Sequence, residues 1–258
     1  MKPTKRSLEE GESASGSVNL VLREGEQVRR PMGHWSESVH ELLQFLEKAG
    51  FEYSPRFLGV DSKAKKEKLT YLDGEVALWP WPAILCSLGG LEQIAEMLKK
   101  YHEVVAKFEP TKNNWHLLDR EIPDDAIIRH GDLGPWNMVW KEGQLVGLID
   151  WDFAEPGAII EDLAQAAWHS IPLKPARRAE QAGVLPALQE ERMEHFCKSY
   201  GVPSELVWQC LSMIQKQEVE RMKIHGENGI QPWKSFLERG DVDAVTEDAE
   251  WLKERGAL

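Results

Sequence analysis

The spacing of apolar residues changes near residue 72, and this change restricts the architectures open to the chain. Before that point the sequence has short runs typical of β-strands and one segment with helical spacing. The expected strands cover 17–23, 26–30, 56–61 and 68–72. In the helical segment, where Ser36 fits the N-cap, one face carries Val39, Leu42, Leu43 and Leu46. The first part of the chain is therefore predicted to be a small sheet with one helix.

Longer helical segments dominate the rest of the chain. Asp73-Gly74 predicts a turn, and the prolines of ALWPWP (77–82) exclude a regular helix or central strand, so we place a hinge there. Helices are expected at 91–108, 159–170, 189–200, 204–225 and 242–255. We predict an α+β fold with a flexible N-terminus (1–16), a small β-rich N-terminal lobe (17–75) and a larger, mainly helical C-terminal lobe (76–258).

The net charge of the chain indicates which kinds of binding partner to expect. The net charge is −12, from 43 acidic and 31 basic residues. Such a surface repels nucleic-acid backbones and attracts cationic small molecules, although solubility alone is an alternative explanation of it. The three cysteines have no CxxC spacing, the N-terminus has no apolar signal segment, and no run approaches the ~18 apolar residues of a membrane span. We expect a cytoplasmic protein that binds neither nucleic acid nor membrane.

The segment 127–152 carries the polar residues best suited to chemistry. Asp132 and Asn137 lie in a loop between two apolar runs, and Asp150 follows a further apolar strand, LVGLI. Phosphoryl transfer needs a carboxylate that accepts the proton of the attacking hydroxyl, for which Asp132 is the candidate. It also needs hard oxygen ligands for Mg²⁺, which Asn137 and Asp150 would supply. His130 is better placed to brace the loop, and Asp152 is either a further metal ligand or a solvated loop residue.

These residues resemble the motifs of the aminoglycoside phosphotransferase family. The pattern H-G-D-x-x-x-x-N stands here as HGDLGPWN (130–137), followed by IDW (149–151), Pro156 and DLA (162–164). The resemblance implies a bilobal, protein-kinase-like fold. It also implies a kinase that uses ATP, with GTP as the alternative, and Mg²⁺ to phosphorylate a hydroxyl of a small polar molecule such as an aminoglycoside or amino alcohol.

The nucleotide-binding end departs from what the family leads one to expect. Kinases of this shape place a Lys on a strand over the phosphates, paired with a helix Glu, whereas this strand carries Arg29 and Arg30. Strand alternation places Arg30 on the same side as Val28, which favours Arg30, and Arg can grip phosphate bidentately. Val39 stands where the helix Glu is expected, so Glu37 or Glu41 would have to compensate. By resemblance, backbone groups of the hinge, including Tyr71 and Leu72, would face adenine.

Other departures keep further functions open. The loop has Gly-Pro-Trp (134–136) where many relatives have His-Pro-Gly, and with VRRP (28–31) this is more like a branch often labelled trifolitoxin-immunity-like. One alternative is therefore a nucleotide-binding immunity or regulatory protein with little phosphoryl transfer. A metal-dependent hydrolase using His130, Asp132 and Asp150 is another, although such enzymes usually need more ligands. The acidic residues of the C-terminal lobe that could face a cationic substrate, or simply lie on solvated helix faces, are Glu218, Glu220, Asp241, Asp243, Glu247 and Asp248. The acceptor and the oligomeric state are left open.

Overall fold

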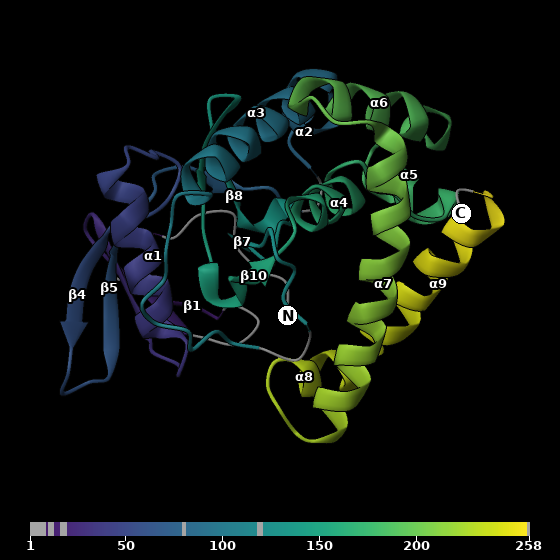
Figure 1. Cartoon of the computed structure of the whole chain (residues 1–258). Coiled ribbons are helices and arrows are strands. Elements are labelled where there is room, and N and C mark those ends of the chain that lie inside the picture. Colours follow the sequence, from purple (N-terminus) through teal and green to yellow (C-terminus); the bar gives the residue numbers. More distant parts are fainter. Residues whose placement is uncertain (1–8, 10–12, 16–19, 79–80, 118–120, 257–258) are drawn as a thin grey trace.

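The computed structural model describes residues 9, 13–15, 20–78, 81–117 and 121–256, and it has a small sheet beside a larger helical part (Figure 1). The sheet contains β1 (Ser13–Ser15), β2 (Leu20–Glu24), β3 (Gln27–Pro31), β4 (Phe57–Asp61) and β5 (Lys66–Thr70). These strands are antiparallel in the order β1-β2-β3-β5-β4, and α1 (Ser36–Lys48) lies beside β4 and β5. Val39 and Leu42 on α1 are fully buried, as are Leu43 and Leu46, which confirms the predicted apolar face of this helix.

Two details of this part differ from the sequence-based expectation. Ser36 is the first residue of α1 and Trp35 occupies the cap position, because the Ser36 hydroxyl turns back to accept the N–H of Gly33 at 2.9 Å. Within the predicted flexible segment 1–16, residues 13–15 form β1 and pair with β2. Residues 1–8, 10–12 and 16 of that segment lie outside the described residues.

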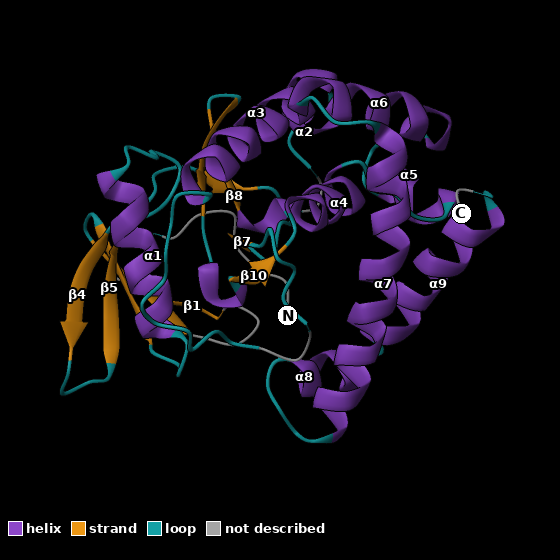
Figure 2. Ribbon diagram, viewed as in Figure 1, coloured by secondary structure: helices purple, strands orange, loops and turns teal. Residues whose placement is uncertain are grey.

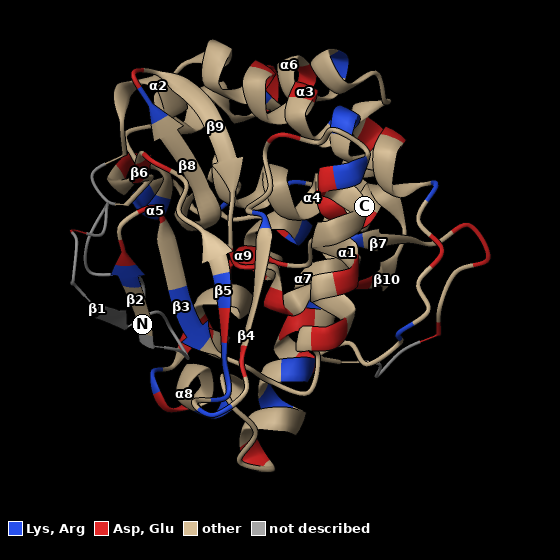
Figure 3. Ribbon diagram, turned by 90° about the vertical axis from the view of Figure 1, so that its left-hand side faces the viewer, with Lys and Arg blue, Asp and Glu red and all other residues tan. Residues whose placement is uncertain are grey.

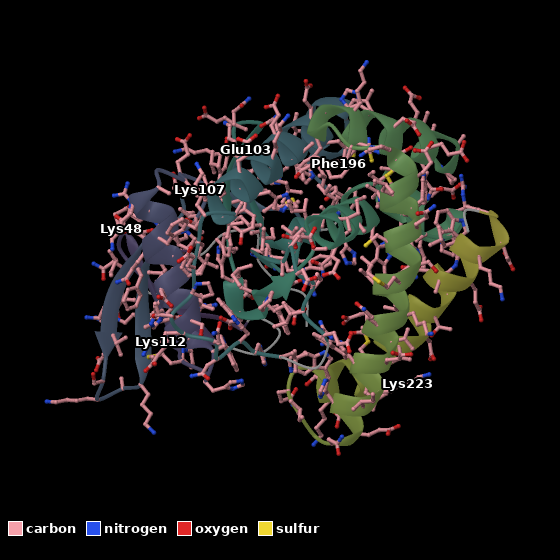
Figure 4. The ribbon with its side chains drawn as sticks, in the orientation of Figure 1. Lys48, Glu103, Lys107, Lys112, Phe196 and Lys223 are labelled. Atoms are coloured by element: carbon pink, nitrogen blue, oxygen red, sulfur yellow. The ribbon has the colours of Figure 1, made fainter. Side chains whose placement is uncertain are left out.

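The helical part holds the long elements predicted from the apolar spacing (Figure 2). Its helices are α2 (Ala83–Cys86), α3 (Leu88–Val105), α4 (Ile159–Ser170), α5 (Ala176–Gln181), α6 (Gln189–Tyr200), α7 (Ser204–Glu227), α8 (Trp233–Glu238) and α9 (Asp241–Glu254). Side chains such as Phe196 of α6 point into the core between these helices, whereas Lys223 lies on the exposed side of α7 (Figure 4). None of the described helices combines the length and apolarity needed to cross a bilayer.

Short strands and single-turn helices make up the remaining elements. They are β6 (Glu75–Val76), β7 (Ile127–Arg129), β8 (Met138–Lys141), β9 (Gln144–Leu148) and β10 (Glu155–Gly157), with 3-10 turns η1 (Pro135–Asn137), η2 (Trp151–Phe153) and η3 (Pro186–Leu188). All of them except η3, which lies between α5 and α6, surround or form part of the loop 130–137. β8 and β9 form a hairpin, β6 pairs with the open edge of β8, and β7 pairs with β10. Because β5 ends at Thr70 and β6 already pairs with β8, the chain crosses between the two parts over residues 71–74. A domain division at residue 75 is still a proposal.

Candidate active site

Asp132 and Asn137 face each other across the turn that links β7 to β8. The amide nitrogen of Asn137 donates to the backbone oxygen of Asp132 at 2.9 Å and to its Oδ2 at 2.8 Å. The indole N–H of Trp136 also points to this carboxylate, at 3.3 Å from Oδ1. Because the nitrogen of Asn137 serves Asp132, the amide oxygen on its other side is available for another partner.

The loop is braced by a neutral histidine. His130 is completely buried; its Nε2 donates to the carbonyl of Ile149 at 3.1 Å, and its Nδ1 accepts the N–H of Asp132 at 3.2 Å. Burial lowers the pKa of His130 to about 4, which keeps the ring uncharged at neutral pH. This is the bracing position predicted for His130, and it joins the Asp132 loop to the strand that leads into Asp150.

Two side chains of helix α4 form hydrogen bonds to the loop that contains Asp132. Asp162 accepts the N–H groups of His130 at 3.0 Å and Gly131 at 3.4 Å. Gln165 bonds the loop twice more, accepting from Leu133 N–H at 3.0 Å and donating to the Gly131 carbonyl at 2.9 Å. Burial would raise the pKa of Asp162, but the hydrogen bond from His102 at 3.4 Å, the charge of Arg129 and the N–H of His130 together keep this pKa below its usual value. Asp162 is therefore an ionised anchor for the loop.

Gly131 has the backbone conformation that lets this loop approach the η2 turn. Its φ is +79°, and a Cβ at this position would lie 2.0 Å from the carbonyl oxygen of Phe153. Any other residue would therefore have both an unfavourable φ and a backbone clash. The glycine in the HGD motif thus brings the segments containing Asp132 and Asp150 together.

Asp150 and Asp152 flank a buried arginine. Asp150 has φ +63°, its side chain is 46% exposed, and its Oδ1 accepts from Arg30 Nη1 at 3.0 Å. Asp152 Oδ1 accepts from Arg30 Nη2 at 2.6 Å. Asp152 is thus a buried partner of the arginine, not a solvated loop residue.

The electrostatics of the site favour a cation. Burial and the charge of Asp150 raise the pKa of Asp132 to about 7, against the hydrogen bonds from Asn137 and Trp136. Partial burial and the charge of Asp152 raise the pKa of Asp150 to about 6, although the side chain is 46% exposed and Arg30 opposes the shift. Carboxylates whose pKa values are raised by the charge of a neighbouring carboxylate are stabilised when a positive ion binds beside them.

The donor atoms suit Mg²⁺ in particular. A carboxylate of Asp150 and the amide oxygen of Asn137 are hard oxygen ligands, and Mg²⁺ commonly uses one or two protein ligands together with water and substrate phosphates. Among the described residues, no group of three or more His, Cys, Asp and Glu side chains is arranged to hold a metal. A cation bound here would therefore depend on Asp150, Asn137 and oxygen atoms from outside the protein.

The structure separates the two arginines predicted to contact phosphate. The basic residues of β3 are blue in Figure 3. Arg30 is 7% exposed and points toward the carboxylates, whereas Arg29 lies on the opposite face of β3, with Nε 2.8 Å from Glu24. Arg29 does not join the site, because neighbouring residues of a strand point to opposite faces. The contacts of Arg30 also include Glu67, which the sequence analysis did not consider. Glu67 is the direct cross-strand partner of Arg30, so a predicted register for β3 and β5 could have identified it.

The hinge residues Tyr71 and Leu72 lie at the end of β5. Tyr71 packs under the guanidinium of Arg23, 3.7 Å from the ring centroid, and lines a cavity of about 470 Å³ together with Gly74, Val76 and Trp140. The side chain of Leu72 packs against Gly147 of β9. Asp132, Asn137 and Asp150 are not among the residues that line this cavity, so it lies on the hinge side of the site.

Of the acidic residues considered for the substrate, Glu218 is placed near the loop. It lies on α7, and its charge contributes to the raised pKa of Asp132. Asp248 instead accepts hydrogen bonds from Trp168 at 2.9 Å and Arg178 at 2.5 Å, and it is 1% exposed. Asp248 is therefore a buried structural residue, and a solvated helix face does not account for it.

Comparison with known sequences confirms the resemblance drawn from the HGDLGPWN and IDW segments. A sequence model described as the phosphotransferase enzyme family matches residues 91–194. The trifolitoxin immunity protein of Rhizobium leguminosarum bv. trifolii is 36% identical over 174 residues, which are 66% of this chain and 65% of that protein. The chain thus spans slightly less than two thirds of that relative's length.

Solved structures confirm the α+β, protein-kinase-like fold. The amicoumacin kinase hAmiN, in complex with AMP-PNP, Ca²⁺ and Ami, has a TM-score of 0.59 at 11% identity, with 98% of this chain and 88% of that chain covered. The GDP and kanamycin complex of APH(2″)-IIia has a TM-score of 0.57 at 15% identity, with coverages of 98% and 94%. The macrolide 2′-phosphotransferase MphH from Brachybacterium faecium has a TM-score of 0.54 at 14% identity, with coverages of 96% and 94%. At these identities the likeness concerns the fold alone.

Proposed function

Residues 91–194 match the phosphotransferase enzyme family, and from this premise we propose that the protein is a small-molecule kinase. It would transfer the γ-phosphoryl group of ATP to a hydroxyl of a small polar molecule, with Mg²⁺ bound to the nucleotide. The observation that carries this proposal is the arrangement of Asp132, Asn137 and Asp150. One carboxylate is oriented by the amide of Asn137, and the second lies near enough to raise the pKa of the first.

Each residue has a chemical role in this proposal. Asp132 accepts the hydroxyl proton as the oxygen forms its bond to the γ-phosphorus and the bond to the leaving ADP oxygen breaks. Asn137 and Asp150 would hold Mg²⁺, which would supply charge neutralisation on the phosphates. Arg30 contacts the phosphates from its position beside Asp150. Most of the rate enhancement would come from positioning and electrostatic stabilisation.

The acceptor is best sought among small cationic alcohols. Asp132, Asp150 and Glu218 make the surroundings of the reacting hydroxyl negative. The ring of Trp136 lies beside Asp132 and contacts His169 edge to face at 4.8 Å, which adds an aromatic surface close to the acceptor. Solved structures with this fold are described as complexes with kanamycin or as a macrolide phosphotransferase, which supports aminoglycosides and amino alcohols as the first compounds to test.

A second candidate follows from the immunity-protein relative. Under this alternative the protein binds nucleotide but transfers little phosphate, and its effect on a peptide toxin arises from binding. Nucleotide binding and turnover must therefore be measured separately.

The test is a mass-spectrometric screen of hydroxyl compounds with ATP, or with GTP, in the presence of Mg²⁺. We expect a product about 80 Da heavier than one acceptor, formed together with the nucleoside diphosphate. Asp132→Asn should retain binding of AMP-PNP and lose turnover by about 10³-fold or more. Asp125→Asn, a change at an exposed loop carboxylate, is the matched control. Tight nucleotide binding by the wild type without turnover on any acceptor would favour the immunity alternative, and full activity of Asp132→Asn would refute the role of Asp132.

A further inference from the structure

Arg30 is held by a buried carboxylate from the neighbouring strand. We propose that Glu67 of β5 and His40 of α1 are the residues that position Arg30 toward the nucleotide phosphates, in place of a helix carboxylate. This inference rests on the proposed function, because it assumes that nucleotide phosphates bind next to Arg30.

The geometry forms a continuous chain of contacts. Arg30 and Glu67 are directly opposite each other in the β3–β5 register. Arg30 Nε donates to Glu67 Oε1, and His40 Nε2 contacts Glu67 Oε2, so both carboxylate oxygens are used. The ring of His40 is stacked on Phe57 with centroids 3.9 Å apart, which fixes its orientation. Arg30 and His40 are each 7% exposed and Glu67 is 1% exposed, so solvent does not compete for these contacts.

This chain of contacts determines where the rest of the guanidinium points. With Nε bound to Glu67, the two terminal nitrogens extend to Asp150 at 3.0 Å and Asp152 at 2.6 Å. A guanidinium is planar, so fixing one of its nitrogens restricts the directions of the others. Glu67 therefore has a specific effect on the direction in which Arg30 presents its charge to the site.

Glu37 and Glu41 of α1, which were expected to replace the missing helix Glu, contact other residues. Glu41 accepts the N–H groups of Thr111 at 3.1 Å and Lys112 at 2.9 Å, and the side chain of Lys112 lies 4.0 Å from Glu37. Lys112 lies on the loop that runs past the exposed side of α1 (Figure 4). The helix thus contributes the imidazole of His40 to the arginine site, while its carboxylates hold this loop.

A physical consequence follows from the strand origin of Glu67. Because Arg30 and Glu67 belong to paired strands, their relative position is set by the backbone hydrogen bonds of the sheet. The Arg30–Glu67 ion pair therefore does not depend on the position of α1. Helix α1 adds only the contact of His40 with the second oxygen of Glu67. Loss of Glu67 should affect phosphate binding more strongly than loss of His40.

The experiment measures binding of two probes, Mg·AMP-PNP and adenosine, to the full-length protein by isothermal titration. Glu67→Gln should weaken Mg·AMP-PNP about 10- to 100-fold, because a charge-assisted hydrogen bond to the arginine is lost, and should leave adenosine unchanged. His40→Phe should weaken Mg·AMP-PNP to a smaller extent, and His40→Gln, which keeps a donor, should restore much of the loss. Glu37→Gln and Glu41→Gln are matched controls on the same helix.

The outcomes separate this inference from the proposed function. If the wild type does not bind Mg·AMP-PNP, both are wrong. If the wild type binds but Glu67→Gln and His40→Phe bind equally well, or lose adenosine and Mg·AMP-PNP alike, only the positioning role is overturned. A thermal melt of each variant accompanies the titration, and His40→Phe decides the question if Glu67→Gln does not fold. Weaker binding in Glu41→Gln together with unchanged binding in Glu67→Gln would assign the role to the helix instead.

Discussion

Replacing Asp132 by Asn should stabilise the protein, and the gain should grow with pH. The pKa of Asp132 is raised from 3.8 to about 7 because burial and the charge of Asp150 disfavour its ionised form. A carboxyl with a raised folded-state pKa contributes stability that is present below pH 3.8 and is lost as the pH rises through about 7. The amide that replaces the carboxyl cannot ionise, so the variant does not suffer this loss.

The magnitude follows from the linkage between proton binding and folding. Each unit of difference in pKa corresponds to about 1.4 kcal/mol. Between about pH 5 and pH 7 the carboxyl of the unfolded chain is ionised throughout, while that of the folded chain becomes about half ionised. The free energy of unfolding of the wild type should therefore fall by about 2 kcal/mol relative to Asp132→Asn over this interval, which corresponds to about 4–8 °C in Tm.

The assay is urea denaturation followed by tryptophan fluorescence at several pH values, with EDTA present so that no divalent cation binds. The wild type, Asp132→Asn and Asp125→Asn are compared, and the last of these removes an exposed carboxylate. The difference between wild type and Asp132→Asn should widen from about pH 5 to pH 7, and the difference for Asp125→Asn should stay flat. A constant difference for Asp132→Asn, or a less stable variant at neutral pH, would refute the electrostatic reasoning.

Three further changes test other parts of the site. Trp136→Phe removes the indole N–H that lies 3.3 Å from Asp132 Oδ1, so the pKa of Asp132 should rise. The acidic limb of the pH profile of kcat/KM should then move to higher pH by about half a unit, and an unchanged profile would contradict this. Gly131→Ala places a Cβ 2.0 Å from the Phe153 carbonyl oxygen, and the free energy of unfolding measured in urea should fall by more than about 2 kcal/mol. Arg29→Gln changes the face of β3 away from the site, so Mg·AMP-PNP affinity by titration should stay within about twofold, and a tenfold loss would place Arg29 in the site.

Periodicity predicted the elements that bury one continuous apolar face. The bounds of α4 (Ile159–Ser170) and α6 (Gln189–Tyr200) agree with the prediction, because apolar residues at helical spacing run through α4 and through α6 from Met193 onward. The short elements α5, α8, β6 and β10 were missed, because each depends on its neighbours in the fold for its stability. The pairing of β10 with β7 includes Pro156, which no strand pattern would suggest.

The candidate site could be predicted where its residues are close in sequence. The spacing of Asp132 and Asn137 within one loop predicted their contact, and strand alternation favoured Arg30 over Arg29. The Arg30–Glu67–His40 contacts could not be predicted in the same way, because they depend on strand register and on the rotation of α1 against the sheet. Those are properties of the packed molecule.

Several features of the site lower the stability of the folded protein, and they occur together. Asp132 is held where its ionised form is disfavoured, Asp150 has a left-handed backbone conformation, and Asp152 lies close enough to raise the pKa of Asp150. Arg30 offsets part of this repulsion, but its charge is shared among Glu67, Asp150 and Asp152. A divalent cation would neutralise what remains, so binding it should both stabilise the fold and lower the pKa of Asp132. A cation bound as proposed would thus gain affinity from the instability of the ligand-free site, and the same cation would make Asp132 an ionised base at neutral pH.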